Sequence, residues 1–234
     1  MKRKLKRKFY FSFFIISMTL LLSGFKVYQQ QLQIVKNNSI AFESQKEKSV
    51  DILEQPLIVI DPGHGGIDSG SENEGILEKD INLEISLKLK QALLDKGYRV
   101  LMTRSDDTAL ELRERSDFAN EAEADLFISL HQNCYSQDTS VSGIEVYYND
   151  DKTTNDERFA QLIQQALVDS TGARDRGIRE QDSLVVTRET TMPAVLVETA
   201  FISNPQELSL ITSSSYQNEV IDGIISGIEQ FLNQ

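Results

Sequence analysis

The chain has 234 residues, and 36 acidic against 24 basic side chains give it a formal net charge of -12. A single cysteine excludes an intrachain disulfide and a thiolate metal cluster, so a metal ion here would need histidine and carboxylate ligands. The acidic balance argues against a general nucleic-acid binder, and the 40% apolar content is typical of a globular chain.

Basic side chains are concentrated at the N-terminus. Six of the first eight residues are Lys or Arg, and residues 9–25 carry no charge. A basic segment ahead of an apolar one is typical of an export signal, which would place the rest of the chain outside the cytoplasm. As a helix the apolar run would span about 26 Å, marginal for a bilayer core of about 30 Å. We predict a signal peptide or an uncleaved signal-anchor helix over residues 1–28, and both alternatives stay open.

Two further segments follow from composition. Residues 29–55 are rich in Gln, Asn, Ser, Lys and Glu and lack a sustained apolar period, which predicts a polar tether. Residues 56–234 show no internal repeat and are of ordinary size for one domain.

Apolar strands alternate with amphipathic helices along this domain. Short apolar runs predict buried strands, and apolar residues recurring every three or four positions predict helices. The expected elements are strand 57–60, helix 81–94 ending at Gly97, strand 98–103, helix 110–124, strands 126–130 and 144–148, helix 156–170 capped by Gly172, strands 184–187 and 194–197, and helix 221–232. This order predicts an α/β fold: a single domain with a mostly parallel twisted sheet flanked by helices on both faces.

Both histidines follow predicted buried strands. His64 lies in a glycine-rich turn, residues 61–66 (DPGHGG), and His131 follows strand 126–130 directly. Glu198 ends strand 194–197, and Glu78 opens the first helix. The carboxyl ends of parallel strands meet at one edge of a sheet, so we expect these groups to converge. Two imidazoles and one carboxylate are the ligand set of a catalytic zinc with one open position.

Each residue also has a plainer explanation. His64 could be a loop hydrogen bonder, His131 a satisfied core residue, Glu78 an acid favoured at a helix N-terminus, and Glu198 a salt-bridge partner. Their joint placement favours metal chemistry. Cys134 lies near His131 but has no free histidine to form a nucleophilic pair, so we interpret it as a packing residue.

Four blocks, in this order, resemble the zinc-dependent N-acetylmuramoyl-L-alanine amidase family of bacterial cell-wall hydrolases, with its amidase type 3 catalytic domain. They are residues 61–66 (DPGHGG), 78–83 (EKDINL), 129–133 (SLHQN) and 197–204 (VETAFISN). The resemblance covers residues 57–232. It implies that His64, Glu78 and His131 bind one zinc ion and that Glu198 is the catalytic carboxylate.

The chain departs from the family pattern in small ways that bear on groove shape and substrate preference. Ala200 stands where the family usually has Gly, and Gln132 and Cys134 replace commonly small residues. A fourth-ligand role for Glu198 stays open as an alternative. Arg188, after strand 184–187, is a candidate to hold a peptide carboxylate or orient Glu198, or else a solvated surface residue. Asn133 is a second candidate for substrate binding.

The resemblance implies hydrolysis of the amide between N-acetylmuramic acid and the L-alanine of the peptidoglycan stem peptide, in cell-wall remodelling or cell separation. Three alternatives remain: the same chemistry on spore cortex, a non-catalytic peptidoglycan-binding regulator, and a metal-dependent peptidase or deacetylase on another small amide. Expected partners are peptidoglycan and, through the N-terminal segment, the cell membrane, but not nucleic acid. The protein would be membrane-anchored or secreted to the cell wall, and the need for an activator protein is open.

Overall fold

The computed structural model describes residues 54–150 and 154–233, with eight separate residues before them: Met18, Lys26, Gln29, Gln30, Gln33, Ile34, Lys36 and Asn37. Apart from these eight residues and residues 54–55, the predicted signal or anchor (1–28) and tether (29–55) lie outside the described residues. The chain divides into two compact units, Met1–Glu54 and Gln55–Gln234. No helix among the described residues is long and apolar enough to cross a membrane.

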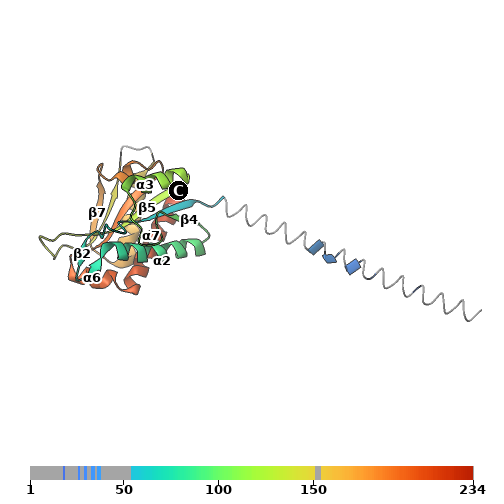
Figure 1. Ribbon diagram of the computed structural model, residues 1–234, viewed down its shortest axis with the longest axis horizontal. Coiled ribbons are helices and arrows are strands. Elements are labelled where there is room, and N and C mark those ends of the chain that lie inside the picture. Colours follow the sequence, from blue (N-terminus) through green and yellow to red (C-terminus); the bar gives the residue numbers. More distant parts are fainter. Residues whose placement is uncertain are drawn as a thin grey trace, which may run out of the picture. The chain divides into compact units, whose positions relative to one another are not determined.

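A six-stranded sheet forms the centre of the second unit, in the order β4-β1-β5-β8-β6-β7 (Figure 1). Its strands are β1 (Leu57–Pro62), β4 (Arg99–Met102), β5 (Leu126–Asn133), β6 (Ile144–Tyr148), β7 (Asp175–Glu180) and β8 (Ala194–Phe201). All neighbouring pairs are parallel except β6 with β8. A separate two-stranded ribbon consists of β2 (Glu72–Asn73) and β3 (Ile76–Leu77). The predicted mostly parallel α/β sheet is confirmed.

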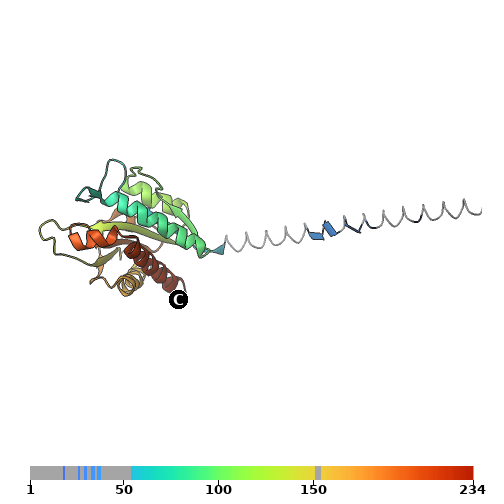
Figure 2. The same ribbon diagram turned by 90° about the horizontal axis from the view of Figure 1, so that it is seen from below.

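Helices cover both faces of the sheet, and β1 is therefore buried on both sides. Ile58 and Ile60 belong to one hydrophobic cluster with residues of α2 (Glu78–Asp95), α4 (Asp156–Thr171) and α7 (Ser214–Leu232). Leu57 and Val59 point the other way and pack with α3 (Leu112–Glu121) and α5 (Val185–Arg188). Figure 2 shows α7, in dark red, against α4. The short helix α6 (Pro205–Ile211) follows β8.

The predicted strand over residues 184–187 is wrong, because this segment is helix α5. The Arg188 N–H donates to the carbonyl oxygen of Leu184 at 3.0 Å, which closes a helical turn. Val186 is buried against the face of the sheet rather than within it, so its apolar character reflects packing and not strand pairing. The strand in this region is β7, a largely polar edge strand that lacks the apolar run used to predict strands.

Two helix starts also differ from the prediction. The last helix begins at Ser214, seven residues before the predicted start, because Ser213 caps it by accepting a hydrogen bond from the Tyr216 N–H. Helix α3 begins at Leu112, two residues after the predicted start, where Glu111 and Glu114 form a capping box. Polar first turns of this kind carry no apolar periodicity.

Candidate metal centre

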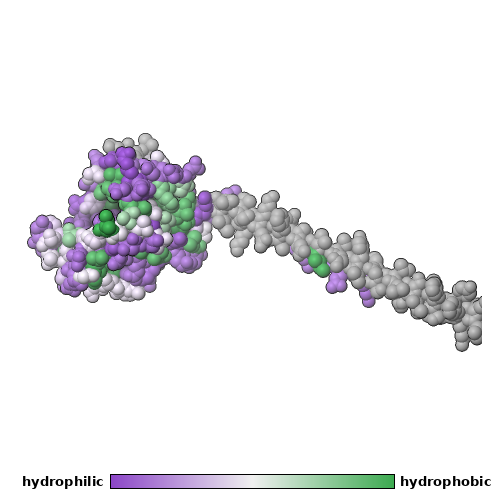
Figure 3. Space-filling model, viewed as in Figure 1, coloured by the Kyte–Doolittle hydropathy of each residue, from purple (hydrophilic) through white to green (hydrophobic). Residues whose placement is uncertain are grey.

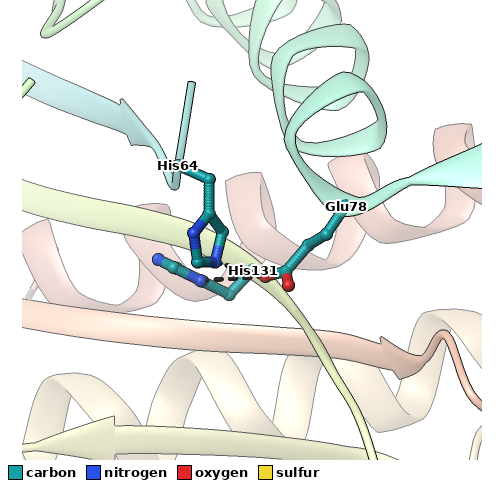
Figure 4. A group of neighbouring side chains, drawn as sticks. All are labelled: His64, Glu78 and His131. Atoms are coloured by element: carbon teal, nitrogen blue, oxygen red, sulfur yellow. Dashed lines mark hydrogen bonds and ion pairs between the residues drawn. The ribbon is translucent and has the colours of Figure 1, made fainter. Parts of the chain in front are cut away.

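Three predicted residues meet at the carboxyl-terminal edge of the sheet (Figure 4). Nε2 of His64 lies 3.1 Å from Oε1 of Glu78, and Nδ1 of His131 lies 3.0 Å from the same oxygen. The two imidazole rings have their centroids 4.8 Å apart at an interplanar angle of 73°. The candidate ligand atoms of all three residues lie within 4.8 Å of one another. The structure thus brings His64, Glu78 and His131 together as one cluster.

The topology of the sheet explains this convergence. Strands β1 and β5 are parallel neighbours, with Pro62 opposite Leu130, so the turn carrying His64 and the end of β5 carrying His131 emerge side by side. Glu78 is the first residue of α2, which follows the β2–β3 ribbon. A helix N-terminus favours a negative charge at this point.

Gly63 allows the close approach of the two histidines. A Cβ atom at Gly63 would lie 2.2 Å from Nε2 of His131, so no larger residue fits between the turn and this ring. His64 itself adopts a left-handed conformation with φ of 60°, which costs free energy for a residue with a side chain. The turn therefore needs support from its surroundings.

Arg115 of α3 gives part of that support from a buried position. Its side chain is 4% exposed and pairs with Asp61 at 2.8 Å. It also donates to the carbonyl oxygens of Pro62, at 2.9 Å, and His64, at 2.8 Å. Because these bonds fix carbonyl groups on both sides of Gly63, they hold the backbone that carries His64.

Arg104 holds the same turn from the end of β4. Its guanidinium donates at 2.9 Å to the carbonyl oxygens of Pro62, Gly63 and Lys79. Sequence reasoning missed both arginines. Arg104 directly follows the predicted strand 98–103, so its place at the carboxyl edge was a usable signal, whereas nothing distinguishes Arg115 from other charges on its helix.

Asp68 is a further residue that the sequence analysis missed. Its Oδ2 lies 2.8 Å from Nδ1 of His64; because a carboxylate only accepts, this contact favours a proton on Nδ1 and makes Nε2 the nitrogen that would bind a metal. Its position four residues after His64 was the only sequence signal. The pKa of His64 is raised, because hydrogen bonds to Glu78 and Asp68 outweigh the opposing effect of burial.

Glu78 is held as a carboxylate by its surroundings. Burial alone would raise the pKa of Glu78, but hydrogen bonds from His131 and His64 hold the pKa well below its usual range. Backbone N–H groups of Gln132 and Ser71 also donate to its two oxygens, at 3.1 and 2.9 Å. An ionised carboxylate of fixed orientation is the form that binds a metal ion.

The donor set fits a divalent cation. Four ligands at about 2.1 Å in a tetrahedron place neighbouring donor atoms about 3.4 Å apart. Two of the donor separations here are 3.0 and 3.1 Å, so a small outward movement of the rings admits an ion. Two imidazoles and one carboxylate leave a fourth position for water or substrate.

Glu198 lies beside this cluster without joining it. It is the register partner of His131 on the adjacent strand β8, so both side chains point to the same face of the sheet. Its Oε2 is buried and has no hydrogen-bond partner among the described residues. Burial, followed by the charges of Glu78 and Glu145, raises the pKa of Glu198 well above its usual range.

Two cavities adjoin the cluster. The first, of about 630 Å³, is lined by the three clustered residues together with Glu198, Tyr147 and Gln181. The second, of about 560 Å³, reaches from His64 and His131 to apolar side chains of α5 and of the loop before α3. Figure 3 shows a hollow in this face of the domain with hydrophobic side chains at its border.

The other predicted site residues differ in their placement. Asn133 lines the first cavity, as does Cys134, which is exposed. Arg188 lines neither cavity. Its guanidinium instead pairs with Glu189 at 2.9 Å and donates to the carbonyl oxygen of Asp182, so its contacts give no support to a role at the metal centre.

Comparison with known proteins identifies relatives over the same region. The family model described as "N-acetylmuramoyl-L-alanine amidase" matches residues 58–230. N-acetylmuramoyl-L-alanine amidase LytC of Bacillus subtilis is 39% identical over 171 residues, which is 73% of this chain but 34% of that protein. The germination-specific N-acetylmuramoyl-L-alanine amidase of the same organism is 31% identical over 196 residues, covering 78% of this chain and 82% of that protein.

A solved structure shares the fold. The CwlD amidase from Clostridioides difficile, determined in complex with the GerS lipoprotein, superimposes with a TM-score of 0.73 at 30% sequence identity. The match covers 76% of this chain and 99% of that one.

Proposed function

The chain belongs to the N-acetylmuramoyl-L-alanine amidase family, and on this premise we propose that His64, Glu78 and His131 hold one zinc ion and that Glu198 moves the proton in amide hydrolysis. The substrate is peptidoglycan, cleaved between N-acetylmuramic acid and L-alanine. One observation carries the proposal: a carboxylate with an unpartnered buried oxygen stands beside two imidazoles and an ionised carboxylate.

The bound metal and the side chains around it have separate roles in the proposed hydrolysis. When bound, zinc supplies Lewis-acid chemistry, which polarises the amide carbonyl and lowers the pKa of water. Glu198 accepts a proton from the attacking water and passes it to the departing L-alanine nitrogen, and its buried Oε2, which has no hydrogen-bond partner among the described residues, is available for this. Asp68 keeps the ring proton of His64 on Nδ1, and the buried arginines fix the turn that carries this ring.

Asn133 is proposed to contact substrate, because it lines the cavity that contains Glu198. The alternative role of Glu198 as a fourth metal ligand predicts that a Glu198→Gln variant binds zinc more weakly. If Glu198 is instead a base that does not bind the metal, the Glu198→Gln variant should keep its zinc affinity and lose turnover.

We infer that the protein acts outside the cytoplasm, because peptidoglycan, the substrate of its amidase family, lies there. We propose wall remodelling or cell separation as its role and the basic and apolar residues 1–28 as a signal peptide or membrane anchor. The germination-specific relative favours a second candidate, the same chemistry on spore peptidoglycan. The lipoprotein bound to a related amidase supports a search for an activating partner.

Mass spectrometry of digested peptidoglycan tests the activity. Purified walls are incubated with the protein plus zinc, with chelator, and with the Glu198→Gln variant. We expect stem peptides with a free L-alanine amine, and their loss in both controls. Release of acetate would instead indicate a deacetylase, and L-alanine remaining on muramic acid would indicate a peptidase; either result contradicts the proposal.

A further inference from the structure

Glu145 lies next to Glu198 in the sheet but takes no part in the metal cluster. The two residues are register partners on the antiparallel strands β6 and β8, so their side chains point to the same face. Partners of this kind have Cβ atoms about 4.5–5.5 Å apart. The Glu145 side chain is only 4% exposed. Two carboxylates this close repel each other, so Glu145 requires compensating partners.

Both oxygens of Glu145 are in fact fully engaged. Nε of Arg176 donates to Oε1, and Nε of Arg179 lies 3.1 Å from Oε2. The hydroxyl of Tyr147 donates to Oε2 at 2.7 Å. Although burial opposes it, this set of donors lowers the pKa of Glu145. Glu145 is therefore a fixed anion that anchors the side chains around it.

A bulge in β7 places both arginines on the same side. Residues three apart in a regular strand point to opposite faces of the sheet. Between β6 and β7, however, the register shifts by one residue, and Gly177 adopts a left-handed conformation with φ of 79°. The extra residue returns Arg179 to the face that Arg176 and Glu145 share. Bulges often re-aim a side chain beside an active site.

The two arginines differ in exposure. The Arg176 side chain is 21% exposed and lies over the ring of Phe201 at 4.9 Å, so it is wedged into the domain. The Arg179 side chain is 49% exposed. Its Nε and Nη2 face Glu145, whereas Nη1 has no partner among the described residues.

Arg179 does not itself line the cavity that contains Glu198, but it lies next to two residues that do. It is the register partner of Tyr147 on β6 and precedes Gln181 by two positions, which puts the three side chains on one face. Tyr147 and Gln181 both line that cavity. The unused donors of Arg179 therefore belong to a side chain that neighbours the cavity lining.

The other cationic side chains near the metal centre already have hydrogen-bond or ion-pair partners. Arg104 and Arg115 bind the carbonyl groups of the histidine turn. Lys79 pairs with Asp107, and Arg188 pairs with Glu189. Among the described residues around the metal centre, Arg179 is the arginine that combines a place beside cavity-lining residues with unused donors.

We propose that Arg179, anchored by Glu145, binds a carboxylate of the peptide half of the substrate and so selects peptides that carry one near the scissile bond. The subsite rests on the proposed amidase function. A guanidinium matches a carboxylate in charge and geometry and does not match a neutral carboxamide as well. This proposal gives Arg179 the role of carboxylate holder for which the sequence offered Arg188 as a candidate.

Two synthetic N-acetylmuramoyl dipeptides test the subsite. They are identical except that the second residue carries a free carboxylate in one and a carboxamide in the other. The wild-type protein should prefer the carboxylate by about tenfold or more in kcat/KM. Arg179→Gln should abolish this preference, mainly by raising KM for the carboxylate substrate, and Arg179→Lys should retain part of it. Arg113→Gln is the matched control, because Arg113 is 74% exposed and pairs with Glu189 outside the cavity.

The possible results separate the subsite from the activity. Equal cleavage of both dipeptides by the wild-type protein would overturn the subsite while leaving the amidase function intact. An Arg179→Gln variant that loses the same factor on both dipeptides would show that Arg179 only supports Glu145, and would also overturn it. If the wild-type protein cleaves neither dipeptide nor whole peptidoglycan, the proposed function itself fails.

Discussion

Gly63→Ala is expected to empty the metal site without unfolding the protein. The added Cβ would lie 2.2 Å from Nε2, 2.3 Å from Cε1 and 2.6 Å from Cδ2 of His131. All three atoms belong to the imidazole ring, so the ring itself has to move. Restoring an ordinary contact of 3.4 Å requires the ring to move by about 1.2 Å. Metal–ligand distances tolerate errors of about 0.2 Å.

The expected loss of zinc affinity is therefore at least about 100-fold, the upper end of what displaced supporting groups cause. The fold should survive, because Gly63 is not among the residues with positive φ and alanine can adopt its backbone conformation. Isothermal titration with zinc measures the affinity, and urea unfolding of the metal-free protein measures stability.

Gly75→Ala is the matched control. Gly75 has φ of 79°, and an added Cβ would have nothing within 4 Å. This variant should lose about 1–2 kcal/mol of stability from backbone strain and keep wild-type zinc affinity. A Gly63→Ala protein that binds zinc as tightly as Gly75→Ala would refute the steric reasoning.

Three further predictions concern the metal, the supporting arginine and the anchored carboxylate. Zinc at about 100 times its Kd should stabilise the protein by about 2.7 kcal/mol in thermal unfolding, and the stabilisation should vanish in His64→Ala. Arg115→Met leaves Asp61 buried without its counter-charge, so the free energy of unfolding in urea should fall by about 3–5 kcal/mol; a loss below 1 kcal/mol would contradict a structural role. Because the pKa of Glu145 is lowered, its ionised form stabilises the fold above the unfolded value of about 4.3, and this contribution is lost as the pH falls further. The stability difference between wild type and Glu145→Gln should accordingly be constant at neutral pH and shrink below about pH 4.3, and a difference that grows in acid would contradict the assignment.

The residues of the centre that could be predicted to converge are those that follow buried strands. His64 and His131 follow apolar runs in β1 and β5, and Glu198 follows the run in β8. The edge at which such strands end is fixed by parallel pairing, so the convergence of these residues needed no further information.

The groups that support the centre could not be predicted in this way. Arg115 donates to Asp61, 54 positions away in the sequence. The negative charge of Glu145 is balanced by arginines of the bulged strand β7, more than 30 positions later. Such pairs leave no periodicity in the sequence. β7 was missed because an edge strand exposed to solvent can be polar, and the valines of α5 suggested a strand because burial on a sheet face also selects apolar residues.

The most direct test of the account is a crystal structure of the zinc-loaded protein with anomalous data at the zinc edge. One ion should be bound by Nε2 of His64, Nδ1 of His131 and a carboxylate oxygen of Glu78, at about 2.0–2.2 Å. The Glu198 carboxylate should lie beside the ion without binding it. An ion bound by Glu198 in place of Glu78, or bound away from these histidines, would contradict the account.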